Sequence, residues 1–337
     1  MSADTSGFDG PTLQVEDLQT YFFTKSGIAR AVDGINFTVA KREVMGLVGE
    51  SGSGKTVTGF SLINLVDPPG KIVGGRILFN GEDLVQASEE RMRHLRGNRI
   101  AMIFQDPMMT LNPVLRIDTQ MVESVIAHEP NVPKEEARQR ARDALGQVGI
   151  PSPDERLKAY PHQFSGGMRQ RVAIAIALLN KPDLIIADEP TTALDVTIQG
   201  QILFEAQKLC RETGTAMIWI THDLAVVAGL ADKICVMYAG RIVEQGAIDD
   251  VLDHPVHPYT RGLLGSVPGH NTRGQRLYQI PGMTPSLLNL PEGCAFSSRC
   301  PSVSGACTAQ PKIEEPIPNR QVRCFHPHMQ AFQEVST

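Results

Sequence analysis

Short apolar runs alternate along the chain with stretches in which apolar residues recur at helical spacing. Residues 44–48, 184–187 and 217–220 are compact apolar runs typical of strands buried in a parallel sheet. Helices are expected at about 56–65 and 198–212, so that strands and helices alternate. This order predicts an α/β core built from strand–helix–strand units.

Two further patterns surround this core. Alternating positions or short apolar runs bounded by turn residues predict additional strands at 13–23, 34–39, 75–80, 99–105, 234–238 and 241–244. The last two would form a hairpin. Residues 117–148 have helical spacing, broken at 129–133, and another helix begins near Ser165. An all-helical subdomain at about 106–178 is therefore expected between the strand regions.

The composition of the chain sets its expected domains. Residues 1–10 are polar and are expected to be disordered. A chain of 337 residues is long enough for a large core domain, which we place at 11–255, and a small second part. After this point the chain becomes rich in Pro, Gly and Cys, and residues 256–337 are expected to form a small irregular appendage.

Charge and hydropathy disfavour several classes of protein. The net charge of −5 gives no basic footprint for binding nucleic acid. No apolar run approaches the roughly 18 residues that a membrane-spanning helix needs. The polar start of the chain also lacks the basic and apolar regions of a signal peptide. We therefore expect a cytosolic protein that does not bind nucleic acid.

Residues 49–56 read Gly-Glu-Ser-Gly-Ser-Gly-Lys-Thr and match the phosphate-binding loop pattern G-x-x-x-x-G-K-[ST] between a predicted strand and a predicted helix. Glycines let successive backbone N–H groups turn toward one centre, and the positive N-terminus of the helix would face the phosphates. Lys55 would add a charge for the outer phosphates, and the Thr56 hydroxyl would ligate Mg²⁺. The residues expected to contact the nucleotide here are Gly49, Ser51, Gly52, Ser53, Gly54, Lys55 and Thr56.

Two carboxylates follow the apolar run at 184–187. Asp188 and Glu189 stand where a parallel sheet presents the carboxyl ends of its strands to a ligand. Asp188 would hold Mg²⁺ through its water shell, and Glu189 would accept a proton from the water that attacks the γ-phosphate. The plain alternative is a solvated strand end, which the phosphate loop upstream disfavours.

A second anion site is expected at residues 165–167, which read Ser-Gly-Gly and precede a predicted helix. Ser165, Gly166 and Gly167 would lie at the positive N-terminus of that helix. Two phosphate-binding sites in one chain suggest that they face different partners.

The order and content of these segments resemble the ATPase cassette of ABC transporters over about residues 11–255. The cassette's signature Leu-Ser-Gly-Gly-Gln is matched at residues 164–168, with Phe164 in place of Leu and Met168 in place of Gln. Met168 lacks the polar side chain that could touch nucleotide, so Ser165 and Gly167 are the better candidates. Closer matches point to the ATP-binding subunit of dipeptide and oligopeptide importers, at residues 103–108, 111–113, 187–195, 236–240 and 257–260 and in the cysteine-bearing tail.

This resemblance implies roles for further residues. Phe22, or the adjacent Tyr21, would stack on the adenine of ATP. Gln105 would be the Q-loop residue and a Mg²⁺ ligand, Asp195 the D-loop residue and His222 the switch histidine that positions water. The catalytic set implied in this way is Lys55, Gln105, Glu189 and His222.

The resemblance also implies partners. Closure of two cassettes would complete each ATP site with the facing signature, and the second cassette is expected to be a paralogue in a heterodimer. Two transmembrane permease subunits would carry the solute, and one would place a short helix on the surface formed by Gln105 and the helical subdomain. A periplasmic or extracellular solute-binding protein would act indirectly. The subunit would lie peripherally at the cytoplasmic face of the inner or plasma membrane.

Cys294, Cys300, Cys307 and Cys324 crowd the end of the chain. Thiols stay reduced in the cytosol, so clustered cysteines there indicate metal or redox chemistry. Their spacings lack the C-x-x-C pairs typical of zinc ribbons, and Cys300-Pro301 is similar to the Cys-Pro of bacterial ferredoxins. A structural [4Fe-4S] cluster is expected, with zinc or four unrelated free thiols as the alternatives.

Two rival functions fit part of the sequence. Residues 180–183, Asn-Lys-Pro-Asp, match the guanine-reading motif of GTPases. In GTPases that motif closes a strand beyond the Mg²⁺-binding aspartate, whereas here it leads into the strand that ends in Asp188. A soluble ABC ATPase of DNA repair with zinc-binding cysteines is the second rival, which the single cassette and the acidic charge disfavour.

Overall fold

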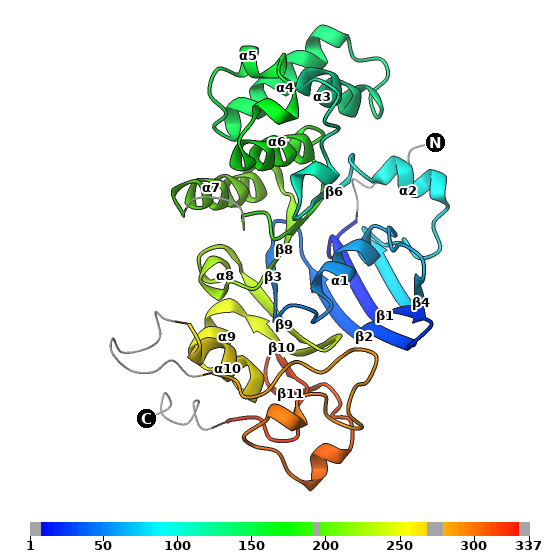
Figure 1. The fold of residues 1–337 in the computed structure, drawn as a ribbon, viewed down its shortest axis with the longest axis vertical. Coiled ribbons are helices and arrows are strands. Elements are labelled where there is room, and N and C mark those ends of the chain that lie inside the picture. The colour runs from blue at the N-terminus through cyan, green and yellow to red at the C-terminus, as the bar shows by residue number, and fades with distance from the viewer. Residues whose placement is uncertain (1–7, 192–195, 268–278, 330–337) are drawn as a thin grey trace. The chain divides into compact units, whose positions relative to one another are not determined.

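The computed structural model describes residues 8–191, 196–267 and 279–329 (Figure 1). The chain divides into two compact units. The first comprises Met1–Thr12, Val39–Val44 and Gln86–Trp219, and the second comprises Leu13–Thr38, Met45–Val85 and Ile220–Thr337. Both units combine strands with helices, which confirms the expected α/β class.

The strands of the first unit are short and almost entirely buried. They are β6 (Ile100–Ile103), β7 (Leu184–Asp188) and the start of β8 (Ala216–Thr221), which are neighbours in the order β8-β7-β6. β6 and β7 run parallel, with Ala101 opposite Ile185. Every residue of β7 and β8 is buried, as their apolar sequences predict. β6 is shorter than the predicted strand at 99–105 because the chain turns away after Ile103.

The helices of the first unit are α2 (Glu89–Leu95), α3 (Ile117–Ile126), α4 (Lys134–Gln147), α5 (Pro153–Leu157), α6 (Gly166–Leu178) and α7 (Val196–Thr213), with 3-10 turns at Pro107–Met109 and Pro161–Gln163. Helices α3 to α6 fall within the predicted helical stretch at about 106–178, whereas α2 and α7 lie outside it, so the bounds of a helical subdomain stay a prediction. Helices α3 to α6 lie together at the top of Figure 1. The predicted break at 129–133 separates α3 from α4.

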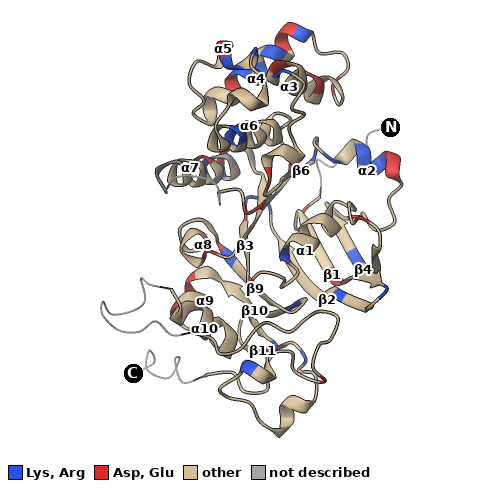
Figure 2. Ribbon diagram, in the orientation of Figure 1, with Lys and Arg blue, Asp and Glu red and all other residues tan. Residues whose placement is uncertain are grey.

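An apolar stripe, rather than surface charge, holds α4 in place. Ala137, Ala141 and Leu145 are fully buried on one face of this helix, where residues three or four apart lie above one another. Acidic and basic residues are intermixed along this helix and are exposed or half-buried (Figure 2). Arg140 there pairs with Glu136 and with a second carboxylate, each at 2.7 Å. Such exposed pairs contribute less than about 1 kcal/mol each.

An antiparallel sheet makes up one part of the second unit. β1 (Leu13–Thr24), β2 (Gly27–Val39), β4 (Gly70–Phe79) and β5 (Glu82–Asp83) are neighbours in the order β2-β1-β4-β5. β1 pairs antiparallel with β4, and Leu13 lies opposite Phe79. The sequence predicts that β2 and β4 start at Gly34 and Gly75. Both strands in fact begin earlier, and these glycines, at φ values of 73° and 87°, lie within them. The predicted antiparallel cap is thereby confirmed.

A second set of strands in this unit contains both parallel and antiparallel pairs. β3 (Val44–Val48), β9 (Lys233–Tyr238), β10 (Arg241–Ala247), β12 (Arg320–Val322) and β11 (Glu314–Ile317) are neighbours in the order β3-β9-β10-β12-β11. β3 and β9 run parallel, while β9 and β10 form the predicted hairpin through Ala239 and Gly240, both at positive φ. The helices of this unit are α1 (Lys55–Leu62), α8 (Leu224–Leu230), α9 (Ile248–Asp253) and α10 (Pro258–Gly265).

Helix α1 is shorter than the sequence predicts. It ends at Leu62, whereas its apolar pattern continues to Leu65. Asn64 adopts a left-handed conformation with φ of 50°, which terminates a helix.

The cysteine-bearing segment contributes strands that the sequence does not predict. β12 pairs antiparallel with β10, with Val322 opposite Glu244. β11 and β12 have four and three residues, too few to show a strand period, and Pro316 interrupts the first. The described C-terminal residues therefore extend the sheet of the second unit and are not irregular throughout. The domain boundary at 255/256 stays a prediction.

A buried ion pair fixes the C-terminal segment to β10. Arg320 donates through Nε and Nη2 to Glu244 Oε1 at 3.0 and 2.7 Å, and its side chain is 3% exposed. The Glu244 carboxylate also accepts backbone N–H groups of Val256 and His257, at 3.0 and 3.1 Å. Removing one partner of such a buried carboxylate is costly, because the charge stays buried and loses part of its compensation.

No helix in the described ranges has both the length and the apolar character that crossing a membrane requires.

We predict that Arg320→Gln lowers the free energy of unfolding by about 3 kcal/mol, because Glu244 is left buried without its cationic partner. Urea unfolding measures the loss. The matched control is Arg76→Gln, which breaks surface pairs with Glu16 at 3.5 Å and Asp83 at 3.3 Å; the Arg76 side chain is 57% exposed, and this change should cost about 1 kcal/mol or less. Equal losses in the two variants would show that the C-terminal segment is not anchored by this pair.

Candidate functional site

The phosphate loop lies in the second unit, between β3 and α1. An added Cβ at Gly49 would lie 2.2 Å from the Met237 carbonyl oxygen, and one at Gly54 would lie 2.1 Å from the Ala31 carbonyl oxygen. Side chains are therefore excluded at both positions. Gly52 has open space around it but a φ of 77°, which favours glycine. The glycine spacing that identifies the motif thus reflects close backbone packing and turn geometry.

Lys55 lies inside the curve of this loop. Its side chain is buried, and Nζ donates to the carbonyl oxygens of Gly49 and Glu50 at 2.8 and 2.9 Å. Helix α1 begins at Lys55 with Gly54 as its N-cap, which supplies no side-chain acceptor. A helix N-terminus without a side-chain cap beside a cationic side chain can bind an anion. Thr56, the expected Mg²⁺ ligand, is exposed in the first turn.

The hairpin between β9 and β10 supports the loop from a distant part of the sequence. The Gly240 N–H donates to the Ser53 carbonyl oxygen at 2.9 Å. Ser53 is fully buried, whereas Ser51 and Gly52 are exposed. Sequence reasoning missed this support, although the Ala239-Gly240 turn is itself a signal of a tight hairpin.

The two aromatic candidates for stacking on adenine point to opposite faces of β1. Thr20, two residues before Phe22 and thus on the same face, hydrogen-bonds to Ser61 of α1 at 2.8 Å. A Cβ at Gly70 would lie 2.6 Å from the Phe22 ring. Tyr21 projects from the other face, and its hydroxyl donates to Asp33 Oδ1 at 2.6 Å. Phe22 is therefore on the side of the helix that follows the phosphate loop.

A polar network occupies the Tyr21 side chain. Arg241 donates through Nε and Nη2 to Asp33 Oδ2 at 3.0 and 2.6 Å. Burial and the hydrogen bond to Asp33 raise the pKa of Tyr21 to about 12. Burial alone would raise the pKa of Asp33, but the hydrogen bonds from Tyr21 and Arg241 lower it. The tyrosine hydroxyl is committed to this network.

The carboxylates and the Q-loop residue lie in the first unit. Asp188 ends β7 and is buried. Glu189 follows with a φ of 45°, a left-handed conformation that is costly for this residue type and often marks a functional position. Gln105, which is exposed, donates through Nε2 to Glu189 Oε2 at 3.3 Å. The structure therefore brings together two of the four predicted catalytic residues.

The segment predicted as a second anion site forms the N-terminus of α6, also in the first unit. Ser165 is the N-cap, and its hydroxyl accepts the Met168 N–H at 3.3 Å. Ser165 and Gly166 are exposed, and Gly166 has open space where a side chain would be. Phe164 is buried and serves as a core residue. The helix end is thus accessible to a partner from outside the chain.

The remaining candidates are differently placed. His222 follows β8 in the second unit, is exposed, and precedes α8, whose N-cap is Asp223. Asp195, the expected D-loop residue, lies outside the described residues. The phosphate loop, Phe22 and His222 belong to the second unit, whereas Gln105, Asp188, Glu189 and the 165–167 segment belong to the first.

The Asn-Lys-Pro-Asp tetrapeptide has a structural role. Asn180 Nδ2 donates to the backbone carbonyl oxygens of Gly97 and Ser124, at 2.8 and 3.2 Å. Asp183 accepts from Arg99 Nε at 2.6 Å. The Asn180 and Asp183 side chains, which would read a guanine, form hydrogen bonds within the first unit. The tetrapeptide therefore does not support a GTPase.

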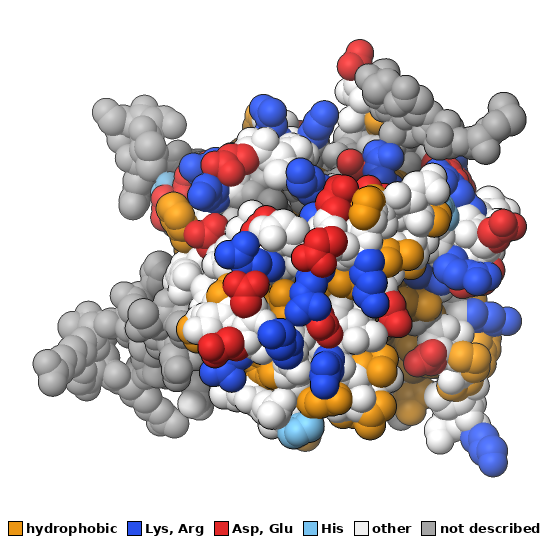
Figure 3. Space-filling view, turned by 90° about the horizontal axis from the view of Figure 1, so that it is seen from above, with side chains coloured by type: hydrophobic (Ala, Val, Ile, Leu, Met, Phe, Trp, Pro, Cys, Tyr) orange, Lys and Arg blue, Asp and Glu red, His pale blue; other side chains and the backbone are white. Residues whose placement is uncertain are grey.

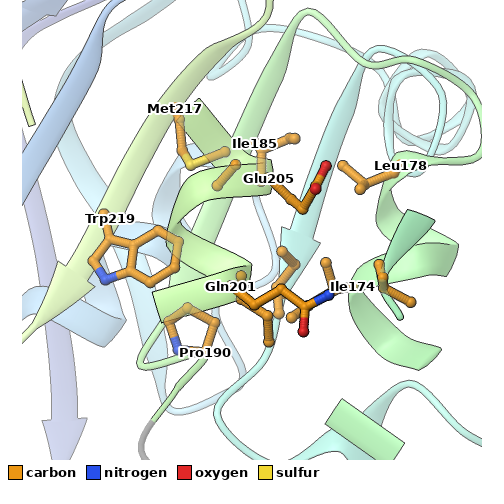
Figure 4. A pocket seen from close by; sticks show the side chains of 12 residues that line it. Ile174, Leu178, Ile185, Pro190, Gln201, Glu205, Met217 and Trp219 are labelled. Atoms are coloured by element: carbon orange, nitrogen blue, oxygen red, sulfur yellow. The ribbon is translucent and has the colours of Figure 1, made fainter. Parts of the chain in front are cut away.

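A small cavity lies next to Glu189 but is unsuited to a nucleotide. Pro190, which follows Glu189, lines it together with Trp219 and Gln201 (Figure 4). Its volume is about 30 Å³, roughly that of a water molecule. The Trp219 indole N–H has no hydrogen-bond partner in the described part of the chain. The cavity is lined partly by α7 and is too small to hold a nucleotide.

The four C-terminal cysteines gather in the second unit. The Cys294 N–H donates to the Cys307 carbonyl oxygen at 3.0 Å. Burial raises the pKa of Cys324 to about 11, and the other three thiols add smaller electrostatic contributions. Backbone N–H groups donate to Cys300 Sγ at 3.4 Å and to Cys324 Sγ at 3.3 Å. Even so, no set of three or more His, Cys, Asp or Glu in the described ranges forms a site for a single metal ion.

Comparisons with known proteins agree with this geometry. Residues 32–192 match the family model described as ABC transporter, and residues 243–307 match the model described as oligopeptide/dipeptide transporter, C-terminal region. The chain is 49% identical to the oligopeptide transport ATP-binding protein OppD of Escherichia coli over 94% of this chain and 93% of the relative. It is 50% identical to the dipeptide transport ATP-binding protein DppD of Bacillus subtilis over 88% of each.

A solved structure supports the same conclusion. The dimeric structure of the ATP-binding cassette MJ0796, in a post-hydrolysis state bound to ADP and Pi, aligns with a TM-score of 0.65 and 26% identity, over 70% of this chain and 98% of that one. These matches are to transport proteins and give no support to the DNA-repair interpretation. With the phosphate loop, the strand-end carboxylates and the helix-capping Ser-Gly-Gly all in place, the chain belongs to the oligopeptide/dipeptide ABC transporter family and is an ATPase of that family.

Proposed function

We propose that this protein hydrolyses ATP to power the import of dipeptides or oligopeptides. The observation that carries the proposal is the identity of about half the residues with peptide transport ATP-binding proteins over nearly the whole chain, combined with an intact phosphate loop. The identity of the peptide depends on subunits outside this chain.

The chain's own residues divide the work of hydrolysis. The loop N–H groups and Lys55 bind the phosphates, and Phe22 stacks on the base from the face of β1 that carries Thr20. Thr56 and Asp188 are the residues that would hold Mg²⁺, with Gln105, and the ion supplies charge stabilisation to the transferred phosphoryl group. Glu189 takes the proton of the attacking water, and Gln105 orients its carboxylate.

A second cassette completes each site. Ser165, Gly166 and Gly167 form an exposed helix N-terminus that suits the phosphates bound by a facing subunit. The MJ0796 cassette is described as dimeric, which supports this arrangement. We propose that the partner is a paralogue, so that the ATPase pair is a heterodimer, with Asp195 and His222 contributing as the D-loop and switch residues.

A membrane subunit docks next to the Q-loop. Met108, Met109 and Val114 follow Gln105 and are 36%, 60% and 75% exposed, an unusual run of apolar surface. An amphipathic helix from a permease subunit would cover it. Two permeases, with a solute-binding protein acting on their outer side, would place this subunit peripherally at the cytoplasmic face of the membrane.

The charge distribution does not favour nucleic acid. Figure 3 shows acidic and basic side chains intermixed on one face, with apolar groups between them. Binding to a phosphate backbone calls for a surface of one sign.

The C-terminal cysteines ligate a structural metal group. Four thiols within electrostatic range and N–H donors to two sulfurs are typical of an iron–sulfur site. The described residues contain no group of three or more His, Cys, Asp or Glu that could hold a single metal ion, so the preference for a [4Fe-4S] cluster over zinc rests on the cysteine spacing. Such a cluster would hold residues 294–324 together, a segment that contains little regular structure. The segment 256–337 would then fold as the appendage typical of peptide importers.

We expect Glu189→Gln in the assembled transporter to lower steady-state ATP hydrolysis by about 10² to 10⁴, because the amide keeps the shape of the side chain but cannot accept a proton. ATP affinity should be unchanged. The control is Glu155→Gln, an exposed carboxylate on α5. Phosphate release at the wild-type rate by the Glu189 variant would remove this residue from the catalytic set.

Cysteines introduced at Met108, Met109 or Val114 should crosslink to a permease subunit in membranes, because these side chains line the proposed docking surface. Val303→Cys, an exposed site in the C-terminal segment, is the control, and the unsubstituted protein accounts for native thiols. Crosslinks that form only at residue 303 would move the docking surface to the C-terminal segment.

Anaerobically purified protein should contain about four iron and four sulfide per chain, as a [4Fe-4S] cluster requires. Cys307→Ser should lose most of this iron, whereas Cys210→Ser, a buried cysteine of α7, should keep it. Stoichiometric zinc would replace the cluster with a zinc site. Absence of iron, sulfide and zinc together would leave four free thiols.

A further inference from the structure

Glu50, the second residue of the phosphate loop, is held by the cysteine-bearing C-terminal segment. Arg299 Nη1 donates to Glu50 Oε2 at 2.7 Å, and Nη2 donates to Oε1 at 3.0 Å. The Thr284 hydroxyl donates to the same Oε2 at 2.6 Å. The two planar groups thus meet as a bidentate pair, the most geometrically restrictive form of ion pair.

The guanidinium is itself held rigidly. The Arg299 side chain is 4% exposed, and its Nε donates to the Pro281 carbonyl oxygen at 2.9 Å. It lies over the rings of Tyr238 and Phe296, 5.8 and 6.0 Å from their centroids. Tyr238 ends β9, directly before the hairpin whose Gly240 supports the loop. Arg299 therefore connects the C-terminal segment both to Glu50 of the loop and to β9, which leads into the hairpin that supports the loop.

A contact from α10 to the loop and a cluster of aromatic rings complete this arrangement. The Glu50 N–H donates to the Tyr259 hydroxyl at 2.9 Å, so α10 also grips the loop. The rings of Tyr238 and Tyr259 are 4.6 Å apart, and Phe296 packs on both. The phosphate loop therefore packs largely against residues that follow position 237 in the sequence.

The charges have a direct consequence for nucleotide binding. A carboxylate within the loop repels the phosphates that the loop binds, and the repulsion is stronger in a half-buried setting than in water. Arg299 neutralises that charge. Burial alone would raise the pKa of Glu50, but the hydrogen bonds from Arg299 and Thr284 hold it below its usual value, so Glu50 is ionised and depends on its partner.

We propose that Arg299 is a positioning residue for ATP binding: through Glu50 it fixes the phosphate loop and cancels the loop's own negative charge, so that nucleotide affinity depends on the folding of the C-terminal segment. The inference rests on ATP binding at residues 49–56. It also explains why the cysteine-bearing segment, with Cys300 directly after Arg299, adjoins an ATP site.

The test compares two buried arginines of the C-terminal segment that bind carboxylates of the second unit. Arg299→Gln removes the partner of Glu50, and Arg320→Gln removes the partner of Glu244, which is remote in sequence from the loop. Titration of the full-length protein with a fluorescent ATP analogue gives the affinity, and urea unfolding gives the stability. Arg299→Gln should weaken binding roughly tenfold or more. Arg320→Gln should leave the affinity of the folded protein within about twofold.

Three further measurements separate positioning from general stability. In the assembled transporter, Arg299→Gln should raise the KM for ATP while kcat at saturation stays within about twofold, because Glu189 and Gln105 are untouched. In a Glu50→Gln background, the additional Arg299→Gln change should have almost no effect on ATP affinity, because the loop no longer carries the negative charge that Arg299 neutralises. Arg299→Lys keeps the charge but cannot form the bidentate hydrogen bonds, so its affinity for the ATP analogue should be intermediate. It replaces Arg299→Gln if that variant does not fold.

Wild-type affinity in Arg299→Gln, or equal affinity losses in the Arg299 and Arg320 variants, would overturn the proposal. Failure of the wild-type protein to bind the ATP analogue would instead contradict ATP binding itself, so the two failures are distinguishable.

Discussion

Close backbone packing of the phosphate loop is the constraint on which the rest of this structure depends. At Gly49 and Gly54 a side chain would collide with carbonyl oxygens of β9 and β2, so the loop can form only where these strands are already in place. The same strands leave Lys55 buried inside the loop, with its ammonium group on loop carbonyls. An anion site is thus preorganised, which reduces the cost of binding phosphate.

The loop's neighbours come from far along the chain. Glu50 is 249 residues from Arg299 and 209 from Tyr259, and Gly240 supports Ser53. The C-terminal strands extend the same set of strands through β10, with a buried arginine–carboxylate pair at the junction. The cysteine-bearing segment is therefore part of the structure that packs against and holds the phosphate loop.

The sequence predicts what depends on local pattern and misses what depends on long-range contacts. Buried strands such as β7, the break between α3 and α4, and the phosphate loop follow from apolar spacing and glycine chemistry. The short strands β11 and β12 form only because β10 offers a partner. The sequence leaves both Phe22 and Tyr21 as candidates, because only the structure shows that the Tyr21 hydroxyl bonds to Asp33. The Arg299–Glu50 pair likewise has no local sequence signal.

Hydrogen–deuterium exchange with and without MgATP tests most directly whether ATP binds in the loop at residues 49–56. We predict slower exchange of the loop and first-turn amides, including that of Thr56, in the wild-type protein and no such slowing in Lys55→Ala. Protection by MgATP confined to other segments, with the loop amides unchanged, would contradict ATP binding in this loop.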